Sequence, residues 1–329
     1  MNVHELNLVK IKEAWQRITP FVHQTPLHHS RTLSEIANCQ VHLKLENMQK
    51  TGSFKIRGAV NKIFSLRPEE MACGVITASA GNHAQGVAWA AKASNVPAIV
   101  VMPEKAPTAK VRATKAYGAN VVLYGQNYDE AYQHARKLQA EQNRTFIHAF
   151  DDPAIMAGQG TIALEIMSQM FDVDAIIAPV GGGGLIAGLA VAAKEHNPKI
   201  KIIGVQAAGA PSMAQALACG ARSCLPSVST IADGIAVKQP GELTFHYTQK
   251  YVDELILVTE EEIIAGILFM LERGKIMTEG AGVVGIAALL ADKIQLPMQK
   301  VAVAVSGGNI DPMLLSMLIE DKYHQVASW

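Results

Sequence analysis

Residues 175–193 have the sequence AIIAPVGGGGLIAGLAVAA, which is the most informative segment for the fold class. It has no charged residue over nineteen positions, a length that could span a membrane as one helix. Pro179 and four consecutive glycines oppose that interpretation, because each glycine costs about 1 kcal/mol in a helix relative to alanine. The stretch therefore predicts a buried strand, a glycine loop and a buried helix in direct succession.

Similar strand-to-helix units recur along the chain. Short β-branched runs alternate with amphipathic stretches of roughly 10 to 20 residues, the pattern of βαβ units and parallel sheets. The runs are VITAS (75–79), AIVVMP (98–103), NVVLYG (120–125), TFIHAF (145–150), AIIAPV (175–180), KIIGVQ (201–206), ELILVT (254–259) and VAVAVS (301–306). Eight strands could close a barrel, but two separate glycine-rich turns favour open sheets with a ligand at their carboxyl ends. We therefore predict an α/β fold with two open, mostly parallel sheets and helices on both faces.

Two domains are expected in a chain of 329 residues. We place a small domain at residues 47–148, inserted into a large domain formed by residues 1–46 and 149–329. No long linker separates them, so the two parts should pack around one site.

Composition excludes several classes of function. The chain has 29 lysine plus arginine residues and 29 aspartate plus glutamate residues. It therefore lacks the excess of positive charge that is typical of proteins that bind nucleic acid or a membrane surface. The four cysteines show no zinc-binding spacing, which predicts reduced thiols in a cytoplasmic protein. The N-terminal residues lack the layout of a signal peptide. The expected partner is a small molecule.

A lysine lies in the segment TGSFKIRGA (51–59), at the predicted start of a helix that follows the strand VHLKLEN (41–47). Its ammonium form is disfavoured near a helix N-terminus and beside Arg57. Lys55 is therefore a candidate for a neutral amine that forms a Schiff base. The alternative is a surface lysine, since lysine is rarely buried.

Residues 79–83 (SAGNH) lie where a strand ends and the helical pattern HAQGVAWAAKA begins. Consecutive backbone N–H groups at such a helix start bind anions, here a carboxylate, with Ser79 and Asn82 as additional polar groups. A plain turn with an N-cap could have the same sequence. His83 by itself is more typical of a packed histidine than of a catalyst.

A glycine loop follows the strand at 175–180. Its residues are Gly181, Gly182, Gly183, Gly184 and Leu185. Glycine lets the backbone curl around an anion at a helix N-terminus, so the loop predicts a phosphate cradle. Gly182, Gly184 and Ala187 also match the degenerate dinucleotide pattern G-x-G-x-x-A. The next strand ends at Gln206 instead of a ribose-binding acid, which weakens a nicotinamide site.

Ser306, in SGGN (306–309), ends the last predicted strand. It places a hydroxyl at the same sheet edge as the glycine loop. A lysine, a carboxylate loop, a phosphate loop and a serine thus converge on one site. Such a site fits an amino acid and a phosphorylated aldehyde cofactor.

The chain resembles the fold type II pyridoxal-phosphate enzymes, and within them the threonine ammonia-lyase (threonine dehydratase) and serine racemase branch. The resemblance runs from Phe21 to about Asp311. It rests on motifs in the family's order: SFKIRGA (53–59), SAGNHAQG (79–86), AGQGT (157–161), GGGGL (181–185), ADG (232–234), TEGAG (278–282) and SGGN (306–309). It implies pyridoxal 5'-phosphate as the cofactor, a tryptophan synthase β-like fold, and a homodimer or homotetramer.

The resemblance also implies roles for individual residues. Lys55 is similar to the lysine that binds the cofactor, Asn82 to the partner of its phenolic oxygen, and Ser306 to the partner of its pyridine nitrogen. Phe54 and Gly234 are similar to residues beside the cofactor ring, and the glycine loop matches the phosphate site. The residues that match the loop for the substrate carboxylate are Ser79, Ala80, Gly81, Asn82 and His83.

Three departures from that family narrow the expected activity. The chain ends soon after Ser306, so we expect no regulatory domain and no inhibition by isoleucine. Gln206 and Ser212 stand where serine racemases carry the acids of a cation site, so no metal is expected. Ala80 replaces a serine of the racemases, and a methyl group cannot donate a proton. We therefore expect β-elimination of L-threonine to 2-oxobutanoate and ammonia, with L-serine to pyruvate as a secondary reaction.

Several alternatives stay open on the sequence. Within the family they are a serine racemase and a hydroxyaspartate dehydratase. Outside it they are a nicotinamide-dependent oxidoreductase and a non-catalytic amino-acid-binding regulator.

Ser306 favours elimination over transamination, because a hydroxyl cannot hold a proton on the pyridine nitrogen as an aspartate would.

Overall fold

The computed structural model describes residues 5–297 and 299–326 and contains two sheets. The larger sheet has six strands in the order β1–β2–β10–β7–β8–β9, and the smaller has four in the order β5–β4–β3–β6. The strands are β1 (Leu27–His29), β2 (Gln40–Leu45), β3 (Val75–Ala78), β4 (Ala98–Met102), β5 (Asn120–Leu123), β6 (Thr145–Phe146), β7 (Ala175–Pro179), β8 (Lys201–Ala207), β9 (Glu254–Val258) and β10 (Lys300–Val305). All neighbours pair in parallel except β1 and β2. The predicted fold class is confirmed.

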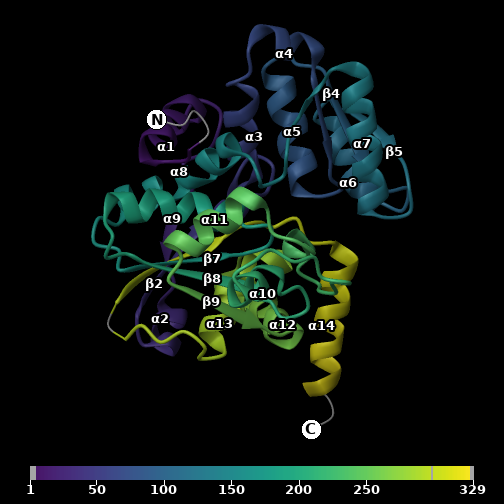
Figure 1. The fold of residues 1–329 in the computed structure, drawn as a ribbon. Coiled ribbons are helices and arrows are strands. Elements are labelled where there is room, and N and C mark those ends of the chain that lie inside the picture. The colour runs from purple at the N-terminus through teal and green to yellow at the C-terminus, as the bar shows by residue number, and fades with distance from the viewer. Residues whose placement is uncertain (1–4, 298, 327–329) are drawn as a thin grey trace.

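Helices cover both faces of each sheet (Figure 1). The α-helices are α1 (Leu8–Ile18), α2 (Arg31–Ala37), α3 (Lys55–Ile63), α4 (Pro68–Cys73), α5 (Asn82–Ala93), α6 (Thr108–Ala116), α7 (Tyr128–Gln142), α8 (Pro153–Gln169), α9 (Gly184–His196), α10 (Ser212–Cys219), α11 (Glu242–Tyr251), α12 (Glu260–Phe269), α13 (Gly280–Leu290) and α14 (Pro312–Val326). The 3-10 turns are η1 (Glu46–Met48) and η2 (Asp233–Ile235), and η3 (Met270–Gly274) is a π-helical turn. No helix of the part that the structure describes is long and apolar enough to cross a membrane.

The apolar sequence of β7 explains why the large sheet is buried on both sides. Successive side chains of a strand point to opposite faces. Ile176 and Ala178 pack with α8 and α9, whereas Ala175 and Ile177 pack with α12 and α13. Helix α8 also packs against α3, which joins it to the helices of the small sheet. The domain boundaries at residues 46/47 and 148/149 stay a prediction.

Two strand predictions differ from the structure. The expected strand at 145–150 is only Thr145–Phe146, and beyond it the His148 ring binds the backbone of the residues that follow. Its Nδ1 accepts hydrogen bonds from the backbone N–H groups of Phe150 and Asp151, at 3.2 and 2.8 Å. The antiparallel edge strand β1 was not predicted, since three residues are too few to show a period-2 pattern.

Candidate active site

One cavity of about 1120 Å³ lies at the carboxyl ends of β3, β7 and β10, and it brings together every site residue that the sequence predicts. Those residues are Phe54, Lys55, Ser79, Ala80, Gly81, Asn82, His83, Gly181, Gly182, Gly183, Gly184, Leu185, Gly234 and Ser306. Ligands of open α/β sheets bind at this edge. The arrangement therefore forms one candidate site, although the role of each residue stays a prediction.

Lys55 is the first residue of α3, as the sequence predicts. Its Nζ donates a hydrogen bond of 2.9 Å to the carbonyl oxygen of Ala149. Burial lowers the pKa of Lys55 to about 8, and the nearby Glu279 carboxylate opposes this shift. The predicted contribution of Arg57 to this pKa is wrong, because two buried carboxylates neutralise its guanidinium.

The segment before Lys55 is fastened to the end of β10. Ser53 and Gly307 form an antiparallel bridge. The N–H of Phe54 donates to the carbonyl oxygen of Ser306 at 3.1 Å, and the Lys55 Nζ lies 5.2 Å from the centre of the Phe54 ring. The lysine and the serine predicted to hold opposite parts of the cofactor are thus held together by backbone contacts.

The glycine loop has no room for side chains. A Cβ on Gly182 would lie 2.5 Å from the ring of Phe150. A Cβ on Gly183 would lie 2.6 Å from the Met213 methyl and 2.8 Å from Thr244 Cβ. Gly183 also has φ +98°, a left-handed conformation that favours glycine. The surrounding side chains therefore fix the path of this backbone.

The same loop presents N–H groups at the start of α9. The hydroxyl of Thr244 donates to the carbonyl oxygen of Gly182 at 2.6 Å, which occupies that acceptor. Helix α9 begins at Gly184, and the first N–H groups of a helix have no acceptor within it. A donor-rich loop at the positive end of a helix suits a phosphate group. The residues present therefore fit the phosphate of pyridoxal phosphate.

The turn from β3 into α5 is the second candidate anion site. The Ser79 hydroxyl oxygen accepts a hydrogen bond of 3.2 Å from the N–H of Gly81. A Cβ on Gly81 would meet no atom within 4 Å. Helix α5 has no acidic residue in its first turn. This open turn is suited to the carboxylate of an exchanging substrate.

Asn82 is joined to an acid that the sequence interpretation missed. Its Nδ2 donates to Oε1 of Glu279 at 2.7 Å, and its Oδ1 accepts from Asn309 at 2.8 Å. Glu279 lines the cavity, and burial raises the pKa of its carboxyl to about 7. The signal was present in TEGAG (278–282), but an acid within a family motif does not reveal that it will be buried.

His83 is buried, with 4% of its surface exposed. Its Nε2 lies 3.0 Å from the carbonyl oxygen of Ile147, and burial lowers the pKa of the ring to about 3. The ring is therefore neutral and donates to this carbonyl. This is the packed histidine considered as an alternative, and a part in the carboxylate loop stays a prediction for its backbone.

Ser306 and Gly234 both line the cavity and both lie next to Ala281. The Ser306 hydroxyl is buried and donates to the carbonyl oxygen of Ala281 at 3.3 Å. A Cβ on Gly234 would lie 3.0 Å from Ala281 Cβ. A hydroxyl is a suitable partner for an uncharged ring nitrogen.

Gln206 and Ser212 lie apart from the cavity. The Gln206 Oε1 accepts from the N–H of Ala214 at 3.1 Å, while its Nε2 and the Ser212 hydroxyl have no partner among the described residues. Over the same residues, no group of three or more His, Cys, Asp or Glu side chains could hold a metal ion. Gln206 thus binds a local helix start instead of a ribose.

Comparison with known proteins identifies the scaffold. A family model described as "Pyridoxal-phosphate dependent enzyme" matches residues 18–307. An L-threonine ammonia-lyase of Thermotoga maritima is 51% identical over 95% of this chain and 78% of its own length. The processed threonine deaminase isoform 2 of Solanum lycopersicum has a TM-score of 0.91 at 39% identity, covering 97% of this chain and 91% of that chain. Maize serine racemase has the same TM-score at 37% identity, covering 97% and 99%.

Proposed function

The chain belongs to the family of pyridoxal-phosphate dependent enzymes, and from that premise we propose that it converts L-threonine to 2-oxobutanoate and ammonia. L-Serine to pyruvate is the proposed secondary reaction. The observation that carries this proposal is the meeting of Lys55, the open turn at 79–82 and the glycine loop at 181–184 in one cavity. A nicotinamide-dependent oxidoreductase is not supported, since the family match assigns the site to a different cofactor.

Bound pyridoxal phosphate supplies an electron sink for charge that develops at the substrate α-carbon. The glycine loop would bind its phosphate, Asn82 its phenolic oxygen and Ser306 its ring nitrogen. The turn at 79–82 binds the substrate carboxylate and so orients the α-hydrogen. Lys55 removes that proton as the general base, and its pKa of about 8 suits such a role near neutral pH.

The fold alone does not choose between elimination and racemisation, because a threonine deaminase and a serine racemase superpose on this chain equally well. Inversion at the α-carbon requires an acid on the face opposite Lys55. The resemblance to the racemases puts Ala80 at that position, where a methyl group can neither donate nor accept a proton. This residue supports elimination as the main reaction.

We also infer that the chain works in the cytoplasm as a homo-oligomer. Helix α14 leaves Met313 and Met317 73% and 58% exposed, and apolar side chains on one helix face are suited to contact with a second copy. Cys39 and Cys73 are free, in keeping with a reducing compartment. Sedimentation of the purified protein measures the oligomeric state, and a monomer at micromolar concentration would contradict this inference.

The decisive experiment is Lys55→Ala. We expect the variant to lose 2-oxo acid production from L-threonine, because it lacks both the cofactor attachment and the base. Borohydride reduction of the parent, followed by peptide mass mapping, should place the cofactor on Lys55. Lys62→Ala, at the other end of α3, is the control and should keep parent turnover. Normal threonine turnover by Lys55→Ala would refute the proposed function.

A further inference from the structure

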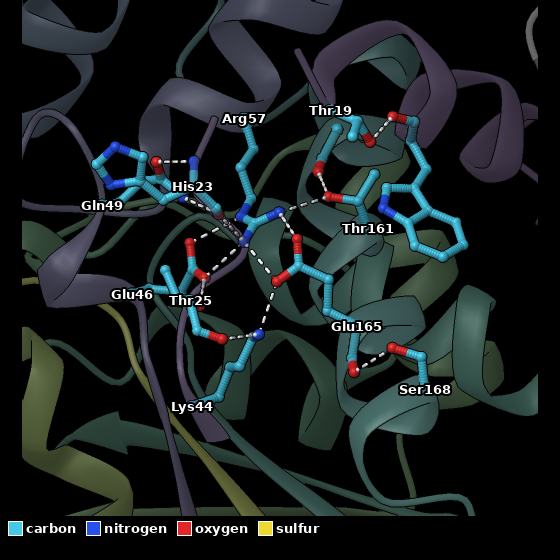
Figure 2. Close-up of polar contacts among 12 residues, drawn as sticks. Thr19, His23, Thr25, Lys44, Glu46, Gln49, Arg57, Thr161, Glu165 and Ser168 are labelled. Carbon is cyan, nitrogen blue, oxygen red and sulfur yellow. Dashed lines mark hydrogen bonds and ion pairs between the residues drawn. The ribbon is translucent and has the colours of Figure 1, made fainter. Parts of the chain in front are cut away.

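Four charged side chains are buried behind the active-site lysine, and we call them the Arg57 cluster. They are Lys44, Glu46, Arg57 and Glu165 (Figure 2). The first three are 0% exposed and Glu165 is 2% exposed. They come from β2, η1, α3 and α8, so the cluster joins the larger sheet to the helix that carries Lys55.

Arg57 makes the most contacts in this cluster. Its Nε and Nη2 donate to the two carboxylate oxygens of Glu46, both at 2.8 Å. Its Nη1 and Nη2 donate to Glu165 at 2.7 and 3.0 Å. Weaker contacts of 3.3 Å reach the Thr161 hydroxyl and the carbonyl oxygen of His23. The planar guanidinium is therefore fixed in orientation as well as in position.

Lys44 completes the charge balance of the cluster. Its Nζ donates to Glu165 at 2.6 Å and to the carbonyl oxygen of Thr25 at 2.7 Å. Two cations then face two carboxylates, and none of the four is left unpaired. Buried ion pairs of this kind add little net stability, because desolvation offsets their attraction. A structural reason other than stability is needed for so many buried charges.

The geometry of α3 supplies that reason. Lys55 and Arg57 are two residues apart, which places them about 200° apart around a helix axis. Lys55 lines the cavity, while Arg57 points to the opposite side of α3. Helix α8 crosses α3 beside Arg57, where a Cβ on Gly158 would lie 2.6 Å from the Arg57 carbonyl oxygen. The close crossing sets the distance between the helices and, through Gly58, limits the rotation of α3, and Arg57 adds directed contacts that restrict this rotation further.

We propose that Arg57 is a positioning residue that fixes the rotation of α3 and thereby the place of the Lys55 Nζ in the cavity. This inference rests on the proposed role of Lys55. The fork of Arg57 binds one carboxylate on η1 and another on α8, so a rotation of α3 would break contacts on two elements. A point charge could not impose the same constraint, because an ammonium rotates about its stem.

The test is Arg57→Lys in the holoenzyme. The variant keeps the charge balance but loses hydrogen bonds to the buried carboxylates, so we expect it to fold with an unfolding midpoint below that of the parent. We expect kcat for L-threonine to fall by about 100-fold, the effect of a displacement of about 1 Å at a reacting group. KM should change little, because the carboxylate turn at 79–82 is untouched. Pyridoxal phosphate should stay bound on desalting, while borohydride traps a smaller fraction of Lys55 in a fixed time.

Lys62→Met is the matched control. Lys62 pairs with Asp152 at 2.7 Å and so joins α3 to the start of α8, but at the far end of α3. Its kcat and its trapped fraction should equal those of the parent. Parent values in Arg57→Lys, equal losses in both variants, or failure of Arg57→Lys to fold would each overturn the proposal. Trapping of the parent cofactor on a lysine other than Lys55 would instead refute the proposed function.

Discussion

The two turns that border the cavity are alike in topology and opposite in packing. Each leads from a parallel strand into a helix N-terminus, β3 into α5 and β7 into α9. In the turn at 181–184 every glycine would place a Cβ within 2.8 Å of another residue. In the turn at 79–82 a Cβ on Gly81 would meet no atom within 4 Å.

This difference matches the ligands that we assign to the two turns. A phosphate that stays bound through many turnovers is suited by a loop whose shape is fixed by Phe150, Met213 and Thr244. A substrate carboxylate that arrives and leaves in every turnover is suited by an open turn. Both turns use the same helix-start chemistry, so packing and not donor type separates cofactor from substrate.

The largest expected effect is that of Gly183→Asp. Strain at φ +98°, contact with Met213 and a negative charge at the phosphate should together raise the Kd for pyridoxal phosphate by about 100-fold or more. Titration of cofactor-free protein measures this constant. The control is Gly220→Asp, which has φ +68° but open space around it and lies outside the cavity lining. Equal cofactor affinity in the two variants would contradict the assignment of the glycine loop as the phosphate-binding site.

Gly81→Asp should act on substrate instead of cofactor. The side chain has room, but its charge faces the position assigned to the threonine carboxylate. We expect KM for L-threonine to rise about 10-fold, because like charges near a protein surface repel by roughly 1 to 4 kcal/mol. Cofactor occupancy should not change. Gly81→Asn has the same size without the charge, and a KM as high as that of Gly81→Asp would count against the assignment.

The free energy of unfolding should depend on pH through a group next to the open turn, because Asn82 at the end of this turn contacts Glu279. Burial raises the pKa of Glu279 from 4.5 in the unfolded chain to about 7. Between these values the folded protein holds the proton and the unfolded chain does not, so this group's contribution to stability falls as pH rises. Urea unfolding of cofactor-free protein measures this effect. The free energy of unfolding of Glu279→Gln, relative to that of the parent, should increase by on the order of 1 to 3 kcal/mol between pH 4.5 and pH 8. A constant difference over that range would show that Glu279 is not buried as described.

The smallest expected signal is D-serine. The parent should release pyruvate from L-serine and form D-serine only in trace amounts, because Ala80 has no proton to give. Ala80→Ser should increase D-serine formation from that low level. Chiral analysis of the amino acids after incubation measures both. Comparable rates of D-serine and pyruvate formation by the parent would move the chain to the racemase branch.

Contiguous motifs made most of the site predictable. Lys55 at the start of a helix and the glycine loop between a strand and a helix are local patterns, and the structure has both. Parallel strands bring their carboxyl ends to one edge of a sheet, so loops that follow such strands meet without any knowledge of the remaining contacts. Family motifs in sequence order added residues such as Gly234, which no local pattern identifies by itself.

Burial and long-range pairing were decided by the tertiary structure. The sequence places Arg57 beside Lys55 and suggests that its charge lowers the lysine pKa, but Glu165, 108 residues away, helps to neutralise it. Glu279 reaches Asn82 across 197 residues, and its raised pKa follows from the cavity wall around it. Desolvation and Coulomb interactions depend on distance in space, which sequence spacing does not encode. The sequence thus determined most of the groups that the site contains, whereas the fold added the buried Glu279 and decided which of the groups are charged and where Lys55 is held.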